Sequence, residues 1–291
     1  TPSYEFFDIF NRDKGSAPSN EMYKFFDRDN NMLVLRPDMT PAVARCVAKY
    51  FMDDDMPLRL CYLERTFKNN TSYQGYLKER AESGAELIGD DSPDADAEMI
   101  AMVIDCLKTA GLKEFQVELG EVAFYRSLLL QSGLDEDAQA RLNDLIENKN
   151  RFGVEEFLKN QNMEESLKEA FLKLPELFGG ISQIKKAKTL THNPQALAAI
   201  ERLERVHTLL EEYHMADYVS YDLGMLSRYQ YYTGIIFKAY TYGTGDYIVT
   251  GGRYNKLLVQ FGKDTPAVGF AIVVDQLMAA LSRQQIHIPV Q

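Results

Sequence analysis

The sequence is poor in cysteine, has no apolar run long enough to cross a bilayer, and carries fewer positive than negative side chains. Its three cysteines, Cys46, Cys61 and Cys106, form no Cys-x-x-Cys pair and have no histidine near them in the sequence. An odd number of isolated cysteines argues against a disulfide framework or a zinc site. We therefore predict reduced core thiols in a cytoplasmic protein that has no metal site and no membrane partner.

The shortage of positive charge also opposes one class of partner. The chain has 32 Lys and Arg against 43 Asp and Glu, which gives a formal net charge of -11. Nucleic-acid affinity comes largely from Lys and Arg side chains that neutralise phosphates. We therefore expect no nucleic-acid partner. With 291 residues, 45% of them hydrophobic, the chain is long enough for a large domain and a smaller one.

The first 126 residues alternate between strand and helix signals. Short apolar or alternating runs predict strands at 32–35, 58–67, 81–88 and 115–124. Helices are predicted at 41–51, which Thr40 and Pro41 would begin, and at 94–110, which Gly111 would end.

From residue 127 to residue 214 only helix signals recur, at 138–146, 154–158, 167–174 and 197–213. Strand signals resume at 218–223, 231–240 and 247–250, and a final helix is predicted at 274–282. The pattern predicts an α+β protein in which helices flank an antiparallel sheet. We expect a core domain at 1–126 and 215–291 and an inserted all-helical subdomain at 127–214.

Two carboxylates share one face of the strand predicted at 81–88. A period of two puts Glu82, Gly84 and Glu86 on the same side. Carboxylates in a protein core need a cation or a hydrogen-bond donor. This face is therefore either solvated or the wall of a pocket for a small cationic ligand, in which Gly84 would leave room for the ligand.

Three other segments are ambiguous when taken alone. A period of two would put Tyr232 beside Gly234, which suits a planar ligand or an ordinary half-buried strand. The glycine pair that precedes Arg253 and Tyr254 is typical of a turn. The polar residues just before the helix at 41–51 are explained by helix capping alone.

Together and in this order, these segments resemble the catalytic domain of class II histidyl-tRNA synthetases. The resemblance covers nearly the whole chain, and the matching runs are 35–40, 62–67, 82–89, 231–234, 251–254 and 265–271. It implies a class II aminoacyl-tRNA synthetase-like sheet of six or seven antiparallel strands. It also implies a histidine pocket on one face of that sheet, in a domain that usually dimerises.

The resemblance implies roles for six side chains. Three of them would hold the α-amino group of histidine, namely Asp38, Thr40 and Glu82, and three would contact the imidazole or line its pocket, namely Glu86, Tyr232 and Tyr254. A buried ammonium makes charge-assisted hydrogen bonds to carboxylates, and an imidazole N–H needs an acceptor. Asp38 stands where the synthetase has a longer Glu, and Glu82 stands where it usually has Gln.

Three positions that carry arginine in the synthetase differ here, at Lys68, Ser227 and Gln276. Asn70 also replaces a Glu, while Arg228 lies one residue beyond Ser227 and is able to replace the missing guanidinium. Lysine keeps a charge but loses the bidentate fork of arginine. Each lost transition-state contact costs on the order of 100-fold in rate. The set predicts a degenerate adenylation site.

A chain that keeps the amino-acid pocket without the phosphate clamps or an anticodon-binding domain resembles the regulatory subunits of ATP phosphoribosyltransferase. That resemblance implies a non-catalytic, histidine-sensing partner of a short-form catalytic subunit, acting as a homodimer within a hetero-oligomer and needing no cofactor. The catalytic subunit joins ATP to phosphoribosyl pyrophosphate in the first step of histidine biosynthesis. A compact histidyl-tRNA synthetase, an amino-acid adenylate-forming ligase, and a synthetase-like module for another ligand or partner remain alternatives.

Overall fold

A computed structural model describes residues 1–10, 17–51, 53–69, 77–227 and 231–287. The chain divides into two compact units. The first comprises Thr1–Asp91, Arg228–Thr233 and Thr241–Gln291, and the second comprises Ser92–Ser227 and Gly234–Tyr240. None of the helices in the described ranges is both long and apolar enough to cross a membrane.

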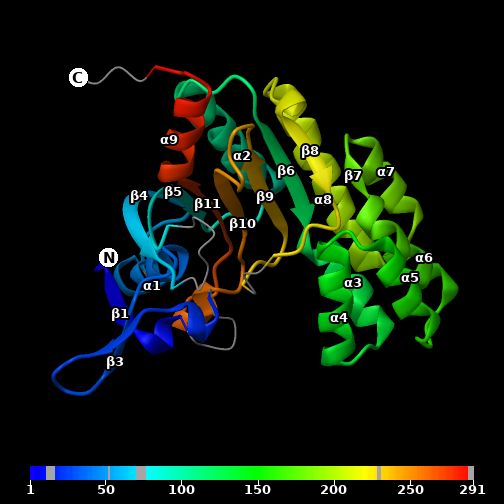
Figure 1. Cartoon of the computed structure of the whole chain (residues 1–291), viewed down its shortest axis with the longest axis horizontal. Helices are drawn as coiled ribbons and strands as arrows, with labels where there is room; N and C mark the ends of the chain where they lie inside the picture. Colours follow the sequence, from blue (N-terminus) through cyan, green and yellow to red (C-terminus); the bar gives the residue numbers. More distant parts are fainter. Residues whose placement is uncertain (11–16, 52, 70–76, 228–230, 288–291) are drawn as a thin grey trace. The chain divides into compact units, whose positions relative to one another are not determined.

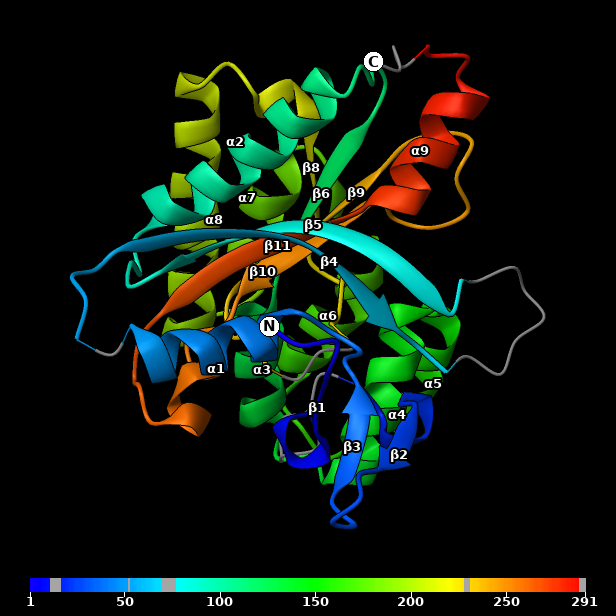
Figure 2. The ribbon, with the colours of Figure 1, turned by 90° about the vertical axis from the view of Figure 1, so that its left-hand side faces the viewer.

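The first unit carries a curved sheet with strand order β4-β5-β11-β10, in which all neighbours are antiparallel. Helix α1 lies on one side of this sheet and helix α9 on the other (Figures 1 and 2). The elements are β4 (Leu58–Phe67), β5 (Glu79–Ile88), β10 (Val249–Arg253), β11 (Ala267–Val273), α1 (Thr40–Tyr50), α9 (Val274–Arg283) and a 3-10 turn at Leu258–Phe261. The α+β class predicted from the sequence is confirmed.

A second, three-stranded sheet of the first unit lies near the N-terminus. Strand β3 (Met32–Leu35) pairs on both edges with antiparallel neighbours, β1 (Tyr4–Phe6) and β2 (Lys24–Phe26). Short 3-10 turns at Phe7–Ile9 and Ser19–Glu21 accompany it. One face packs around a small core of Phe10, Met22 and Val34. The sequence patterns predicted β3 but neither of its short partners.

The second unit contains four strands in the order β9-β6-β8-β7, covered by helices. Its elements are α2 (Pro93–Thr109), β6 (Gln116–Glu121), α3 (Val122–Ser132), α4 (Glu136–Glu147), α5 (Arg151–Lys159), α6 (Glu165–Lys173), β7 (Phe178–Gly179), α7 (Ser182–Thr189), α8 (Pro194–Glu212), β8 (Val219–Asp222), β9 (Ile235–Tyr240) and 3-10 turns at Leu174–Glu176 and Ala216–Tyr218. Strands β6 and β8 are parallel, which the antiparallel prediction did not include. The helices between them supply the long crossover that parallel pairing requires.

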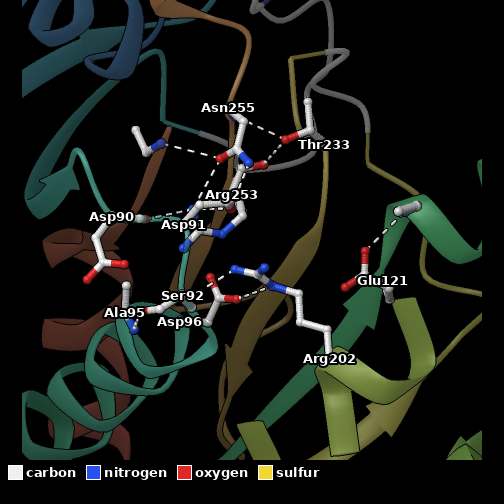
Figure 3. A network of polar contacts seen from close by, with 12 residues as sticks. Asp90, Asp91, Ser92, Ala95, Asp96, Glu121, Arg202, Thr233, Arg253 and Asn255 are labelled. Atoms are coloured by element: carbon white, nitrogen blue, oxygen red, sulfur yellow. Dashed lines mark hydrogen bonds and ion pairs between the residues drawn. The ribbon is translucent and has the colours of Figure 1, made fainter. Parts of the chain in front are cut away.

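An ion pair inside the second unit ties α8 to the start of α2. Arg202 donates to the Asp96 carboxylate at 2.7 Å and to the backbone oxygen of Ser92 at 3.2 Å (Figure 3). Asp96 is fully buried. The Ser92 hydroxyl accepts from the Ala95 N–H, so the same residue caps α2. Because α2 and α8 pack together with β6 and β8, the compact unit extends beyond residues 127–214, and the predicted division into domains stays a prediction.

Several local predictions are confirmed and others are wrong. Strands β3 and β4 have the predicted bounds, and Gly111 follows α2 with a φ of 101°. The strand predicted at 231–240 begins only at Ile235, so residues 231–234 have no period of two. All three cysteines are free, but Cys61 is exposed and the other two are half-buried, so they are not core thiols.

Candidate functional site

The acidic face predicted from the sequence lies on strand β5. Glu82, Gly84 and Glu86 share this face because side chains alternate along a strand. On the neighbouring strand β4, Tyr62 is directly opposite Gly84. On β11, Gly269 is directly opposite Glu86. Two carboxylates are therefore held in fixed register at the middle of the first unit's sheet.

A cavity in the first unit contains about 370 Å³ of space free of protein atoms, part of which is open solvent. It is lined by Pro37, Asp38, Thr40, Glu82, Tyr231, Tyr232, Thr250, Tyr254, Gly269, Phe270 and Ala271. Five of the six predicted ligand-binding residues are among them, and they come from segments far apart in the chain. Only Glu86 of the six does not line the cavity.

Glu86 lies directly behind the cavity wall and is 2% exposed. Its carboxylate accepts from the Tyr254 hydroxyl at 2.5 Å and from the Thr40 hydroxyl at 3.3 Å. Burial raises the pKa of Glu86 to about 8, and the Asp38 charge adds to this while the two hydroxyl donors oppose it. Glu86 therefore holds a proton near neutral pH in the free protein and reaches the cavity through the hydroxyls that bind it.

Gly269 makes the position of Glu86 possible. A Cβ atom at residue 269 would overlap one carboxylate oxygen of Glu86 and would lie 2.8 Å from the backbone oxygen of Ala85. The backbone at Gly269 is thus covered by the carboxylate itself. Only glycine permits this close approach, which is a reason for a glycine at a strand position that no turn requires.

Asp38 and Glu82 form the other acidic part of the cavity. Asp38 accepts from the Tyr231 hydroxyl at 2.9 Å and from the Thr40 N–H at 3.0 Å, and Glu82 accepts from the Thr66 hydroxyl at 2.9 Å. Burial raises the pKa of both carboxyl groups, that of Glu82 to about 7. The Asp38 charge raises the pKa of Glu82 further. The two groups repel each other when both are ionised.

The tyrosines form an aromatic cluster around these acids. The ring centroid of Tyr231 lies 4.8 Å from that of Tyr232 and 6.0 Å from that of Tyr254. Tyr62 was not predicted as a site residue, yet burial and the charges of Glu86 and then Glu82 raise its pKa well above its usual range. Its place opposite the glycine between the two acids of β5 follows from the register of β4 and β5, so no signal within either strand's own sequence identifies it.

The glycine-rich segment before Tyr254 has a structural anchor. Arg253 is 2% exposed, and it donates to the Asp90 backbone oxygen at 3.0 Å and to the Asn255 side chain at 3.1 Å (Figure 3). It also pairs with Asp91 at 3.2 Å, and its own backbone oxygen accepts from the Thr233 N–H at 2.8 Å. These contacts fix the backbone of the residue before Tyr254. The Tyr254 phenol, one residue beyond the end of β10, lines the cavity and donates to Glu86.

The predicted adenylation positions have different surroundings. Lys68 is half-buried, and its charge lowers the pKa values of Asp38 and Glu82 against the effect of burial. Gln276 lies in the first turn of α9, where its neighbour Asp275 accepts from the Ala81 N–H at 2.7 Å. Ser227 belongs to the second unit. Asn70 and Arg228 lie outside the described residues.

Metal binding has no support in the described part of the chain. Among those residues, no group of three or more His, Cys, Asp or Glu side chains is arranged to hold an ion. The acids of the cavity are instead met by hydroxyls, a backbone N–H and the charge of a lysine. Such a site attracts a ligand that carries positive charge and N–H donors.

Comparison with known proteins supplies the family. The histidyl-tRNA synthetase family model matches residues 1–277. The chain is 40% identical to an ATP phosphoribosyltransferase regulatory subunit of Acetivibrio thermocellus, over 99% of this chain and 69% of that protein. It is 41% identical to the protein of the same name from Clostridium acetobutylicum, over 97% of this chain and 70% of that protein.

A solved structure agrees with these relatives. A Bacillus halodurans protein described as an ATP phosphoribosyltransferase regulatory subunit/histidyl-tRNA synthetase superposes with a TM-score of 0.89 and 34% identity. The match covers 97% of this chain and 73% of that one. The fold is therefore that of the class II histidyl-tRNA synthetases. Within this class, the chain belongs to the family of ATP phosphoribosyltransferase regulatory subunits.

The raised pKa values predict how stability depends on pH in the ligand-free protein. The folded protein keeps protons on Glu82 and Glu86 up to about pH 7 and pH 8, whereas an ordinary Glu releases its proton near 4.5. Between these values the folded state binds more protons than the unfolded state. The free energy of unfolding should therefore fall as pH rises through this range.

Replacing Glu86 tests this assignment. Urea unfolding of Glu86→Gln between about pH 5 and pH 8 should show a shallower fall in stability than the wild type. Glu79→Gln makes the same chemical change at an exposed position of β5 and serves as the control. An unaltered slope in Glu86→Gln would show that this carboxyl group is not protonated in the folded protein.

Proposed function

We propose that this protein is a non-catalytic regulatory subunit of an ATP phosphoribosyltransferase and binds histidine in the cavity of its first unit. Its partner is a short-form catalytic subunit, which needs this chain for activity and for histidine feedback on the first step of histidine biosynthesis. The carrying observation is an acidic, tyrosine-lined cavity in a chain whose relatives are named regulatory subunits of that enzyme.

The chemistry of the cavity supports an amino-group subsite at Asp38, Thr40 and Glu82. The two carboxylates repel each other, and each still has lone pairs beyond those used by its donors. An ammonium group placed against both would relieve the repulsion and form charge-assisted hydrogen bonds. The additional charge at Glu82, compared with the Gln usual in the synthetase, strengthens this attraction.

The imidazole subsite is proposed around Glu86, Tyr232 and Tyr254. In the free protein the Tyr254 hydroxyl holds one oxygen of Glu86. A ligand N–H would take over this acceptor, and the Tyr254 ring would then line the side of the imidazole. Ionisation of Glu86 is required for the strongest form of this hydrogen bond, so binding of a cationic ligand favours release of its proton.

Lack of adenylation activity is the second part of the proposal. The charge of Lys68 acts on Asp38 and Glu82, so it serves the acids of the cavity. The neutral Gln276 lies beside an acidic residue, Asp275, in the first turn of α9. These surroundings support a site that has exchanged phosphate binding for amino-acid binding. The proposal includes no cofactor and no nucleic-acid partner.

A homodimer within the hetero-oligomer completes the proposal. Five large apolar side chains of the three-stranded sheet are exposed by 38% to 59%: Tyr4, Phe6, Phe25, Phe26 and Met32. By strand register, Tyr4, Phe6 and Phe25 share one face of this sheet, where the ring centroids of Tyr4 and Phe25 lie 5.9 Å apart, whereas Phe26 and Met32 lie on the other face. An exposed apolar patch such as that of Tyr4, Phe6 and Phe25 is typical of a protein–protein interface. We assign this patch to a second copy of the chain, because β1 and β2 are both edge strands of this sheet within the described residues, and an edge strand is a template for pairing with another chain.

Histidine binding is the first test. Isothermal titration should detect histidine binding to the wild-type protein and a loss of about 100-fold in Glu86→Ala, because a hydrogen bond to a charged group contributes about 1.5 to 3 kcal/mol. Glu79→Ala removes an exposed carboxylate from the same strand and should bind normally. Equal affinities in all three proteins would remove Glu86 from the ligand site.

Pyrophosphate exchange separates the regulatory subunit from its main alternative. The synthetase family match and the positive charge kept at Lys68 favour a compact histidyl-tRNA synthetase or a related ligase as the second candidate. We expect no histidine-dependent exchange of pyrophosphate with ATP above background. Exchange at a rate that depends on both histidine and ATP would establish an adenylating enzyme.

Coupling to the catalytic subunit is the third test. Histidine affinity should change when the catalytic subunit is added, and the affinity of the two subunits should change by the same factor when histidine is added. Coupling of this kind is typically about 1 to 3 kcal/mol, or about 5- to 150-fold. Identical histidine affinities with and without the partner would argue against feedback through this chain.

A further inference from the structure

The space left by Gly84 is filled by an aromatic ring. A Cβ atom at Gly84 would overlap the Cζ and Oη atoms of Tyr62 and would lie 2.5 Å from the backbone oxygen of Phe270. Tyr62 lies directly across from Gly84 in the β4–β5 register, so its phenol extends over the glycine toward β11. The prediction that Gly84 leaves room for a ligand is therefore wrong, because Tyr62 occupies that room.

The tip of the Tyr62 ring lies among the acids of the site. The charges that act on its hydroxyl are, in order of strength, those of Glu86, Glu82 and Asp38. Tyr62 also raises the pKa of Tyr254, the hydroxyl donor to Glu86. Among these acids, Glu86 therefore acts most strongly on the Tyr62 hydroxyl, and Glu86 lies at the proposed imidazole end of the site.

Tyr62 differs from the other tyrosines of the cluster in what it binds. The hydroxyls of Tyr231 and Tyr254 each donate to a buried carboxylate. Within the described residues, the hydroxyl of Tyr62 makes no such donation to an acid. Tyr231 and Tyr254 each satisfy a buried charge through the hydroxyl. Tyr62 does not, and it contributes to the site through the space that its ring fills.

The cavity ends beside this ring. Two neighbours of Gly84 line the cavity: Glu82, two positions earlier on β5, and Ala271, which is directly opposite Gly84 on β11. Neither Gly84 nor Tyr62 lines the cavity within the described part of the chain. The ring lies behind these two lining residues and fills the space over the glycine, so the cavity does not continue there.

We propose that Tyr62 is a specificity-determining residue whose ring forms a wall behind Glu82 and Ala271, which stops the ligand space from extending over Gly84. This inference rests on the proposed function, in which the cavity binds histidine with its imidazole toward Glu86. The wall limits the ligand side chain to an unsubstituted five-membered ring. A substituent on a ring carbon would have to overlap the phenol or displace it.

Histidines methylated on a ring carbon are suitable probes, because 2-methylhistidine and 5-methylhistidine keep both ring nitrogens. One methyl group in a closed pocket changes binding by about 10- to 200-fold. In isothermal titrations of the whole chain, the wild type should bind histidine at least about tenfold more tightly than one of the two isomers. Tyr62→Ala should reduce this ratio to about threefold or less.

Matched variants distinguish the proposed role of the Tyr62 ring as a wall from a general structural role of this residue. Tyr62→Phe keeps the ring and should keep the wild-type ratio, whereas Tyr62→Leu shortens the side chain and should lower it even if Tyr62→Ala does not fold. Leu63→Ala changes the next residue of β4, which is 70% exposed, and should leave the ratio unaltered. Thermal unfolding identifies which variants are folded.

The outcomes distinguish this inference from the function on which it rests. If folded Tyr62→Leu or Tyr62→Ala binds histidine and keeps the wild-type ratio of affinities for histidine and the methylated histidine, Tyr62 does not form the wall. The proposed function would be unaffected. Loss of affinity for all three ligands by the same factor would likewise assign Tyr62 a structural role. A wild-type protein that binds no histidine would overturn the proposed function and this inference together.

Discussion

The constraint on which the site depends is the gathering of three carboxyl groups around one small space, where Asp38 and Glu86 are buried and Glu82 is half-buried. Asp38, Glu82 and Glu86 would each be costly to bury without donors, and their mutual repulsion adds to that cost. The fold supplies a backbone N–H at the start of α1, the charge of Lys68 and four hydroxyls, those of Thr40, Thr66, Tyr231 and Tyr254. The pKa values of the three acids remain raised because these groups offset only part of the cost of burying the carboxylates.

This arrangement explains features of the first unit that have no other local reason. Gly269 is glycine because a carboxylate lies against its backbone, and Arg253 is buried because it fixes the strand end from which Tyr254 extends. Gly269 leaves room for the Glu86 carboxylate, and Arg253 fixes the backbone beside Tyr254, which donates to that carboxylate. The same acid therefore links the middle of β11, the end of β10 and the start of α1.

The sequence predicted the parts of the site that follow from periodicity. Strand β4 and the common face of Glu82 and Glu86 were predicted correctly, because a period of two in a long strand fixes which side chains share a face. The strand at β9 was placed too early, since aromatic residues favour strands even where tertiary contacts hold them in a loop. The role of Tyr62 depends on β4–β5 register, which no local pattern of one strand encodes.

The negative charge of the cavity also gives a physical reason why it would bind an amino acid without activating it. Adenylation brings a polyphosphate against the bound amino acid, and buried carboxylates repel phosphates as strongly as they attract an ammonium. A synthetase offsets this repulsion with guanidinium groups, whereas the charge of Lys68 is already engaged by Asp38 and Glu82. On the proposed function, tighter recognition of the amino group and loss of phosphate chemistry are two results of one change in charge. On the same proposal, the site would transmit its occupancy through the proton that Glu86 releases and the Tyr254 hydroxyl that the ligand displaces, and neither change needs a chemical reaction of the ligand.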